Sequence, residues 1–331
     1  MFKLDRQRRF DTLLPLVPSV TGGPSPEPSV VRGVPTIREW PTWLLLGGCY
    51  GAWLASLLGH SALGPLWFVP LVLLVTLHSS LQHELLHGHP TRSRRLNELL
   101  AFPSLGLFIP YRRFRDLHIA HHRDENLTDP YDDPESWYVS ETCWRRTGPL
   151  LRALLALNAT LLGRVLLGPA LALGGFWRSE WRAARGGRRD VRRAWLVHVA
   201  ALVPVLVVLA SAGIALPLYA VAVAYPAMSL LMIRTFIEHR AAEAVPERTA
   251  VVEAGPLMSL LFLNNNLHAV HHDAPSLPWY ALPGRWQASR SAVLASNGDY
   301  HFPDGYAGVA RRWLLARREP VVHPHRRRER R

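Results

Sequence analysis

The sequence predicts an all-α integral membrane protein, a bundle of four transmembrane helices arranged as two hairpins. Residues 41–90 contain no lysine or arginine and a single acid, Glu84, and residues 194–233 contain no charged side chain. Each of these apolar blocks is about twice as long as the ~20 residues that cross a bilayer. A break lies near the middle of each block, at 60–65 and at 211–217. Each block is therefore expected to cross the membrane twice.

The alternative for such blocks is the buried core of a large soluble helical protein. An uncharged run of this length would then need other protein on every side, whereas lipid covers it without special arrangement. The membrane interpretation is therefore preferred.

The basic residues predict the orientation of the hairpins. The net charge is +13, and Lys3 is the only lysine, so nearly all of the bases are arginine. Arginine-rich stretches flank both hairpins, whereas the two breaks contain none. The positive-inside rule then places both termini and every large polar segment in the cytoplasm. Nucleic acid is not an expected partner, because no basic segment belongs to a recognisable nucleic-acid module.

Three regions are expected along the chain: a proline-rich cytoplasmic arm at 1–40, a membrane domain at 41–290, and a basic cytoplasmic tail at 291–331. The first hairpin should run from about residue 42 to 81 and the second from about 195 to 236. The apolar stretch 149–176 is long enough to cross, but one crossing would place arginines 178–193 outside. It is therefore interpreted as one or two interfacial or re-entrant helices that return to the same side.

Histidines at metal-ligand spacing follow both hairpins. HELLH at 83–87 puts two imidazoles at i and i+4, and HIAHH and HAVHH each have the pattern H-x-x-H-H, which gathers three imidazoles on one side of a helix. A further histidine lies in EHR after the second hairpin. The candidate metal ligands are His83, His87, His118, His121, His122, His239, His268, His271 and His272.

Nine imidazoles are too many for one ion and suit two, because a catalytic zinc takes about three protein ligands. Imidazole binds iron, zinc and copper, so the ligand type leaves the metal open. The two cysteines, Cys49 and Cys143, are too few for a thiolate cage or a disulfide framework, which suits a reducing compartment.

HELLH also fits the H-E-x-x-H pattern of zinc peptidases. An intramembrane metalloprotease would need an aspartate ligand from a second apolar segment. The only candidate, Asp304, lies in a polar stretch after the last expected span. A peptidase would also leave seven histidines without a role, so a zinc intramembrane metalloprotease is a remote alternative.

The three boxes HELLH, HIAHH and HAVHH, in this order around two hairpins, resemble those of the membrane fatty acid desaturase and hydroxylase superfamily over about residues 40–285. The resemblance implies four spans with a cytoplasmic helical cap that holds two non-haem irons through the nine histidines, with His239 as the extra ligand after the last span. His78 and His89 lie close to the first box but are not required by the family pattern. Glu84, Glu238, Asp124 and Asp273 adjoin ligands and are candidates to orient the imidazoles.

The reaction implied by the resemblance is an O2-dependent oxidation of an unactivated C–H bond in a membrane lipid or acyl chain. Fatty acid desaturation is the preferred outcome, with alkane or fatty acid hydroxylation and carotenoid ketolation or hydroxylation as alternatives. The H-E-x-x-H form of the first box is shared with alkane hydroxylases, and TDPYDDPES resembles the DDP run of bacterial carotene ketolases. The segment NNNLHAVHHDAPSLPWYALP is instead most similar to bacterial desaturase-type proteins, so a bacterial inner membrane is expected. No residue beyond the metal centre is assigned to catalysis. Trp279 and Tyr280 are expected at the membrane interface, as anchors or at the substrate entry.

No haem module or cysteine cluster is fused to the chain. Electrons are therefore expected from an external donor of the ferredoxin, rubredoxin or cytochrome b5 type with its reductase.

Overall fold

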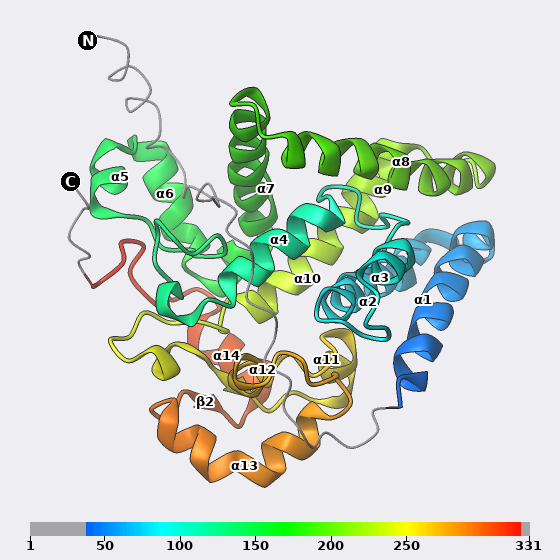
Figure 1. Cartoon of the computed structure of the whole chain (residues 1–331). Coiled ribbons are helices and arrows are strands. Elements are labelled where there is room, and N and C mark those ends of the chain that lie inside the picture. The colour runs from blue at the N-terminus through cyan, green and yellow to red at the C-terminus, as the bar shows by residue number, and fades with distance from the viewer. Residues whose placement is uncertain (1–37, 326–331) are drawn as a thin grey trace.

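The computed structural model describes residues 38–325, so most of the arm expected at 1–40 and the last six residues of the tail lie outside the described part. Helices dominate the described residues (Figure 1). Two short strands occur among the described residues, β1 (Val251–Val252) and β2 (His301–Phe302), and they pair in parallel. The prediction of a helical fold is confirmed, apart from this short pair.

The helices follow one another along the whole described chain. The α-helices are α1 (Trp40–Leu58), α2 (Phe68–Leu86), α3 (Arg94–Leu100), α4 (Tyr111–His121), α5 (Glu141–Arg146), α6 (Pro149–Asn158), α7 (Leu161–Arg185), α8 (Arg189–Ser211), α9 (Leu216–Tyr219), α10 (Tyr225–Thr235), α11 (Pro256–Leu261), α12 (His268–Asp273), α13 (Leu282–Ser296) and α14 (Gly305–Trp313). Short 3-10 or π turns are η1 (His60–Leu66), η2 (Asp124–Asn126), η3 (Ala220–Ala224) and η4 (Val245–Arg248).

Three helical segments of the described chain are long and apolar enough to cross a membrane: α2, α8 and the continuous run Leu216–Thr235 formed by α9, η3 and α10. Helix α1 joins them if it is counted together with η1, to which it is bent by 85°. Both predicted breaks interrupt the helices, and both contain a glycine in the left-handed region, Gly64 (φ 59°) and Gly213 (φ 68°). Glycine adopts this conformation without the steric cost of a Cβ. Gly213 lies two residues after the end of α8, whereas α1 already ends at Leu58, before Gly64.

The ambiguous apolar stretch 149–176 forms two helices, α6 and α7, and neither is among the candidate spans. The turn between them is tight. Thr160 accepts a hydrogen bond from the Gly163 amide at 3.0 Å, as an N-cap residue does. A Cβ on Gly163 would lie 1.9 Å from the carbonyl oxygen of Leu157, so this turn requires glycine. Helix α7 then packs along α10.

The core joins the apolar helices to the end of the described chain. Leu81 of α2, Phe236, Phe262 and Val309 of α14 are each at most 1% exposed and belong to one buried cluster. Helix α13 runs across residue 290, where the sequence placed the start of the tail, and lies on the opposite side of the molecule from α8 (Figure 1). Between these two sides, the ends of α2, α4 and α12 meet.

Candidate metal centre

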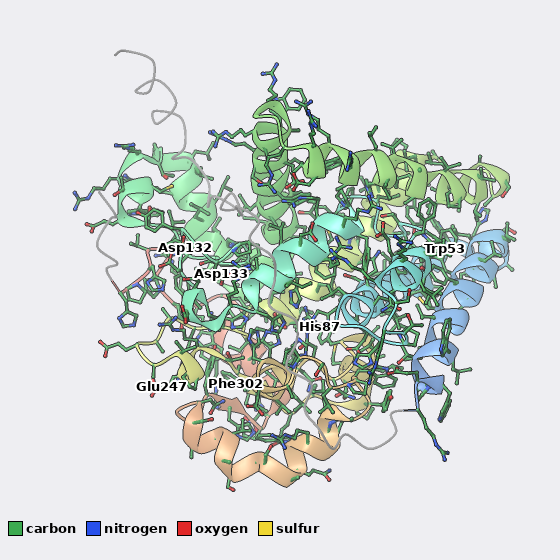
Figure 2. All side chains as sticks on the ribbon, in the orientation of Figure 1. Trp53, His87, Asp132, Asp133, Glu247 and Phe302 are labelled. Carbon is green, nitrogen blue, oxygen red and sulfur yellow. The ribbon has the colours of Figure 1, made fainter. Side chains whose placement is uncertain are left out.

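Three helix ends and one loop carry the nine predicted histidines. His83 lies in the last turn of α2 and His87 caps that helix; His118 and His121 end α4, and His122 caps it. The third box forms α12, and His239 follows α10. Figure 2 shows His87 near the middle of the molecule. Residues up to 189 positions apart are thus brought to one place.

The structure gathers all nine into two groups. Group 1 contains five histidines, and group 2 contains four; within each group one nitrogen per ring lies within 4.8 Å of the others. The members of group 1 are His83, His87, His118, His122 and His271, and those of group 2 are His121, His239, His268 and His272.

The second and third boxes each contribute to both groups. His118 and His122 of α4 belong to group 1, and His121 between them belongs to group 2. In α12 the pattern is reversed, since His268 and His272 belong to group 2 and His271 to group 1. Helix geometry explains this division: positions i and i+4 are about 40° apart around the axis, whereas i+3 and i+4 are about 100° apart. A single H-x-x-H-H box can therefore face two ions.

The nitrogens converge as metal ligands do. In group 1 the Nε2 atom of His118 is 2.9 Å from that of His83 and 3.0 Å from that of His122. In group 2 the Nε2 atom of His239 is 3.1 Å from that of His121 and 3.0 Å from that of His268. Two nitrogens about 2.1 Å from an ion are about 3.0 Å apart at a right angle and about 3.4 Å apart at the tetrahedral angle. The observed spacings fit right-angled coordination.

Outer hydrogen bonds hold several rings through the other nitrogen. Nδ1 of His118 is 2.8 Å from Oε1 of Glu135, and Nδ1 of His121 is 2.8 Å from Oδ1 of Asp133. Nδ1 of His268 is 2.8 Å from Oδ1 of Asn265. Such partners fix the ring orientation and the tautomer that leaves Nε2 for a metal. The sequence reasoning missed these three side chains, although two of them lie in the acidic run after the second box and the third in NNN before the third box.

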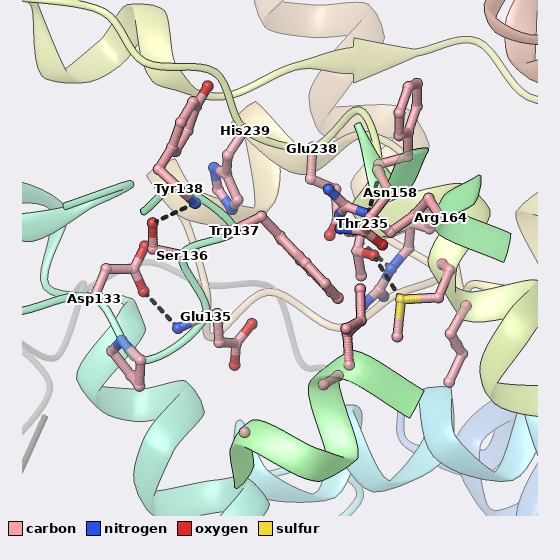
Figure 3. A pocket seen from close by; sticks show the side chains of 18 of the residues that line it. Asp133, Glu135, Ser136, Trp137, Tyr138, Asn158, Arg164, Thr235, Glu238 and His239 are labelled. Carbon is pink, nitrogen blue, oxygen red and sulfur yellow. Dashed lines mark hydrogen bonds and ion pairs between the residues drawn. The ribbon is translucent and has the colours of Figure 1, made fainter. Parts of the chain in front are cut away.

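The local fold of the acidic run places its carboxylates. Asp133 accepts the backbone amides of Thr128 (2.8 Å) and Glu135 (2.9 Å), so its side chain closes the loop that follows α4. Asp133 is 4% exposed, and Figure 3 shows it beside Glu135 at the edge of a cavity. The loop after α4 therefore holds two carboxylates, those of Asp133 and Glu135, against the histidine groups.

The residues proposed from the sequence as ring partners behave differently. Glu84 accepts a hydrogen bond from the backbone amide of Trp279 at 3.1 Å. Its Oε1 lies 4.0 Å from Nδ1 of His83, which is too far for a hydrogen bond. Glu238 lies 3.6 Å from Nδ1 of His268 but forms an ion pair with Arg234 at 2.7 Å.

Asp273 forms an exposed ion pair with Arg285 at 3.2 Å, and the side chain of Asp124 lies outside the described part. Adjacency in the sequence was thus a poor guide to contact.

The protonation of the rings suits metal binding. Burial lowers the pKa of His122, His239, His268 and His271, which keeps these rings neutral with a lone pair for a metal. Burial also lowers the pKa of His121, but the buried carboxylate of Asp133, together with that of Glu135, outweighs it and raises the pKa to about 9. A metal would displace this proton.

Neither of the two extra histidines near the first box belongs to a group. Nε2 of His78 is 3.0 Å from the hydroxyl of Tyr50. Nδ1 of His89 is 2.7 Å from Oε1 of Glu39, and its Nε2 is 3.0 Å from the carbonyl oxygen of Ser276. Both rings are thus engaged elsewhere.

The geometry of the described residues does not support a zinc peptidase site. Asp304, the possible third zinc ligand, precedes α14, faces Arg311 at 3.7 Å and belongs to neither histidine group. Five imidazoles in one group also exceed the four ligands of a tetrahedral zinc.

A cavity of about 350 Å³ adjoins the centre (Figure 3). His83 of group 1 and His239 of group 2 both line it, so it touches both groups. Apolar side chains from α7 and α10, such as Leu171, Phe176 and Leu231, form another part of its wall. Its volume lies within the usual range of small-molecule pockets. Trp279 and Tyr280 are not among its lining residues.

The sequence model of the fatty acid desaturase family matches residues 71–303, which include all nine histidines. The chain belongs to this family. No curated protein matches the chain. The match and the candidate spans together identify a membrane protein and an oxidoreductase of the desaturase and hydroxylase type. Members of this family typically depend on a metal, and the two histidine groups could hold one each.

Proposed function

We propose that the two groups bind two iron ions through the nine histidines and that the protein oxidises an acyl chain with O2, as a fatty acid desaturase. The observation that carries the proposal is the pair of convergent imidazole groups beside one largely apolar cavity. Right-angled spacing of nitrogens, with coordination positions to spare, is typical of non-haem iron sites.

Bound iron would supply the capacity to activate O2 and oxidise an unactivated C–H bond. The chain's own residues do the rest. Asp133 and Glu135 fix the rings of His121 and His118, and Asn265 fixes that of His268. The apolar wall from α7 and α10 would hold an alkyl chain beside both groups and exclude water from it.

Desaturation, hydroxylation and carotenoid oxidation use the same ligands, so the products must decide between them. Hydroxylation of an alkyl chain is the second candidate, because the Glu84 form of the first box is shared with alkane hydroxylases.

We also propose where the enzyme lies in the cell and which proteins supply its electrons. The arginines on α4 and around the α7–α8 turn lie at helix ends, which supports a cytoplasmic metal centre. The membrane is proposed to be a bacterial inner membrane, with both termini on its cytoplasmic side. Electrons would come from a separate ferredoxin, rubredoxin or cytochrome b5 with its reductase.

The first test is the metal content of the detergent-purified protein, measured by elemental mass spectrometry against protein concentration. About two irons per chain are expected from the two groups. One zinc and no iron after iron-replete growth would overturn the proposal.

The second test is lipid profiling of cells that express the protein with a ferredoxin and its reductase. New double bonds in acyl chains support desaturation, whereas alcohols or ketones assign the hydroxylase or carotenoid alternatives. The variant His121→Ala is the inactive control.

A further inference from the structure

The cavity beside the histidines is also lined by charged side chains. Four are acids, Asp133, Glu135, Glu238 and Glu319, and three are arginines, Arg164, Arg234 and Arg318. Arg234 faces Glu238 at 2.7 Å, and Arg318 faces Glu319 at 3.5 Å and donates to the carbonyl oxygen of His239 at 2.7 Å. Two of the three guanidinium groups therefore face an acidic side chain.

Arg164 of α7 has no such partner. It is 6% exposed, and within the described chain no carboxylate oxygen lies within 4.0 Å of its guanidinium. Its Nε donates to the backbone carbonyl of Asn158 at 3.2 Å, and the indole of Trp137 covers one face at 3.7 Å. A guanidinium stays protonated in proteins, and an unpaired buried charge is costly. The remaining N–H groups of Arg164 can therefore donate to an anion, whose charge would offset that of the guanidinium.

The groups around Arg164 add to the cost of burying its charge. Burial, and after it the charge of Arg318, lowers the pKa of Arg164, which reports how poorly the protein alone stabilises the cation. Burial raises the pKa of Glu319 to about 8, so this acid is mostly uncharged at pH 7 and compensates little. The positive charge around Arg164 is therefore only partly compensated by the protein.

Packing fixes the arginine in place. A Cβ on Gly168 would lie 2.9 Å from Cδ of Arg164 and 3.1 Å from Sδ of Met232, so the aliphatic part of Arg164 is tightly held where α7 meets α10. The side-chain oxygen of Asn158 is buried without a hydrogen-bond partner in the described residues. Since an amide can turn by 180°, Asn158 can offer a ligand its NH2 group instead.

We propose that Arg164 and Asn158 bind the anionic head group, a carboxylate or a phosphate, of a single-chain amphiphile whose alkyl part runs along the cavity to the histidines. Figure 3 shows Trp137 between His239 and Arg164, so the head group and the reacting carbons would lie on either side of this indole. A guanidinium suits both oxyanions, because its fork of N–H groups donates two parallel hydrogen bonds. The inference rests on the proposed function and names its substrate class.

The test compares decanoate, decyl phosphate and decanol, which share one alkyl chain, as ligands of the purified protein in a non-ionic detergent. Affinity is measured by calorimetry and by the ligand-induced rise in melting temperature. The wild type should bind at least one of the two anions about tenfold or more tightly than decanol, since hydrogen bonds to charged groups are the strong ones. The anion that binds more tightly identifies the head group as carboxylate or phosphate.

Two variants locate the site. Arg164→Gln should abolish the preference for the anion and leave decanol binding unchanged. The matched control is Arg152→Gln, because Arg152 also stacks on a tryptophan, Trp144, and donates to backbone carbonyls but does not line the cavity. It should keep the preference.

Equal affinity of the wild type for decanol and for both anions would overturn the inference, even if Arg164→Gln failed to fold. An equal loss in Arg152→Gln and Arg164→Gln would also overturn it. The proposed function is judged separately, by iron content and lipid products: a protein with two irons that oxidises lipids but does not prefer anions would refute this inference alone.

Discussion

The two histidine groups differ in how their rings are held. In group 2, at least three of the four rings have a partner for Nδ1: Asp133 for His121, Asn265 for His268, and the carbonyl oxygen of Arg248, at 3.3 Å, for His239. In group 1, among residues 38–325, the structure gives such a hydrogen bond to one of five rings, His118.

The difference shows two ways of holding the rings of a candidate metal site. Group 1 has more imidazoles, and four of the five come from the ends of α2 and α4, whose backbones set the positions. Group 2 has one fewer, and His239 lies on a loop, so outer hydrogen bonds must orient its rings. Group 2 should therefore be the more fragile of the two.

The largest effect is expected from removing one ring. His121→Ala leaves group 2 with three imidazoles and should lower iron from about two to about one per chain and activity by more than about 100-fold, beyond the 10–100-fold typical of outer partners. His271→Ala leaves group 1 with four and should retain more iron. Elemental analysis and product formation measure both. Equal iron loss in the two variants would contradict the difference between the groups.

The next effect is expected from the outer carboxylates. Asp133→Asn should weaken iron binding about 10–100-fold, because it removes the charge beside His121 from a loop that it also closes. Glu135→Gln should cost less, since the Glu135 side chain is 36% exposed against 2% for Asp133. Iron titrations of the apo-protein provide the comparison. The neighbouring exposed acid supplies the control, Asp132→Asn, which should bind iron as the wild type does.

A smaller effect is expected from the neutral partner. Asn265→Ala removes the acceptor of the His268 Nδ1 hydrogen bond, and a neutral hydrogen bond contributes about 0.5–1.5 kcal/mol. Iron affinity should fall about three- to tenfold, which the same titrations measure. A loss as large as that of Asp133→Asn would show that charge is not what distinguishes the two partners.

The smallest effect is expected from changing Asp273, which adjoins a predicted ligand in the sequence. Asp273 follows His272, but its carboxylate faces Arg285 at the surface. Asp273→Asn should change iron content and activity by less than about twofold, because exposed ion pairs contribute little. A strong loss of iron would restore Asp273 as a ring partner.

Much of the arrangement was predictable from local sequence. The apolar blocks predict helices because their composition and length suit a bilayer, and their breaks coincide with Gly64 and Gly213, where the backbone needs glycine. The histidines were recognised by their spacing on helices. Their assignment as metal ligands remains a prediction, although the structure brings all nine together.

The rest depends on contacts between distant segments. Asp133 reaches His121 through a loop whose shape no periodicity encodes, and the sequence of the stretch 149–176 does not indicate that Arg164 is buried beside a cavity. Its burial depends on the packing of α7 against α10 at Gly168. The pair β1–β2 joins segments about fifty residues apart, and two-residue strands have no pattern to recognise.

The exchange of rings between boxes would couple two bound ions thermodynamically. Because α4 and α12 each supply histidines to both groups, the first ion to bind would hold both helices in place and lower the entropy cost for the second. Loading should therefore be cooperative. At less than two equivalents of iron, a population of these chains would contain mostly empty and fully loaded molecules, with few carrying a single ion.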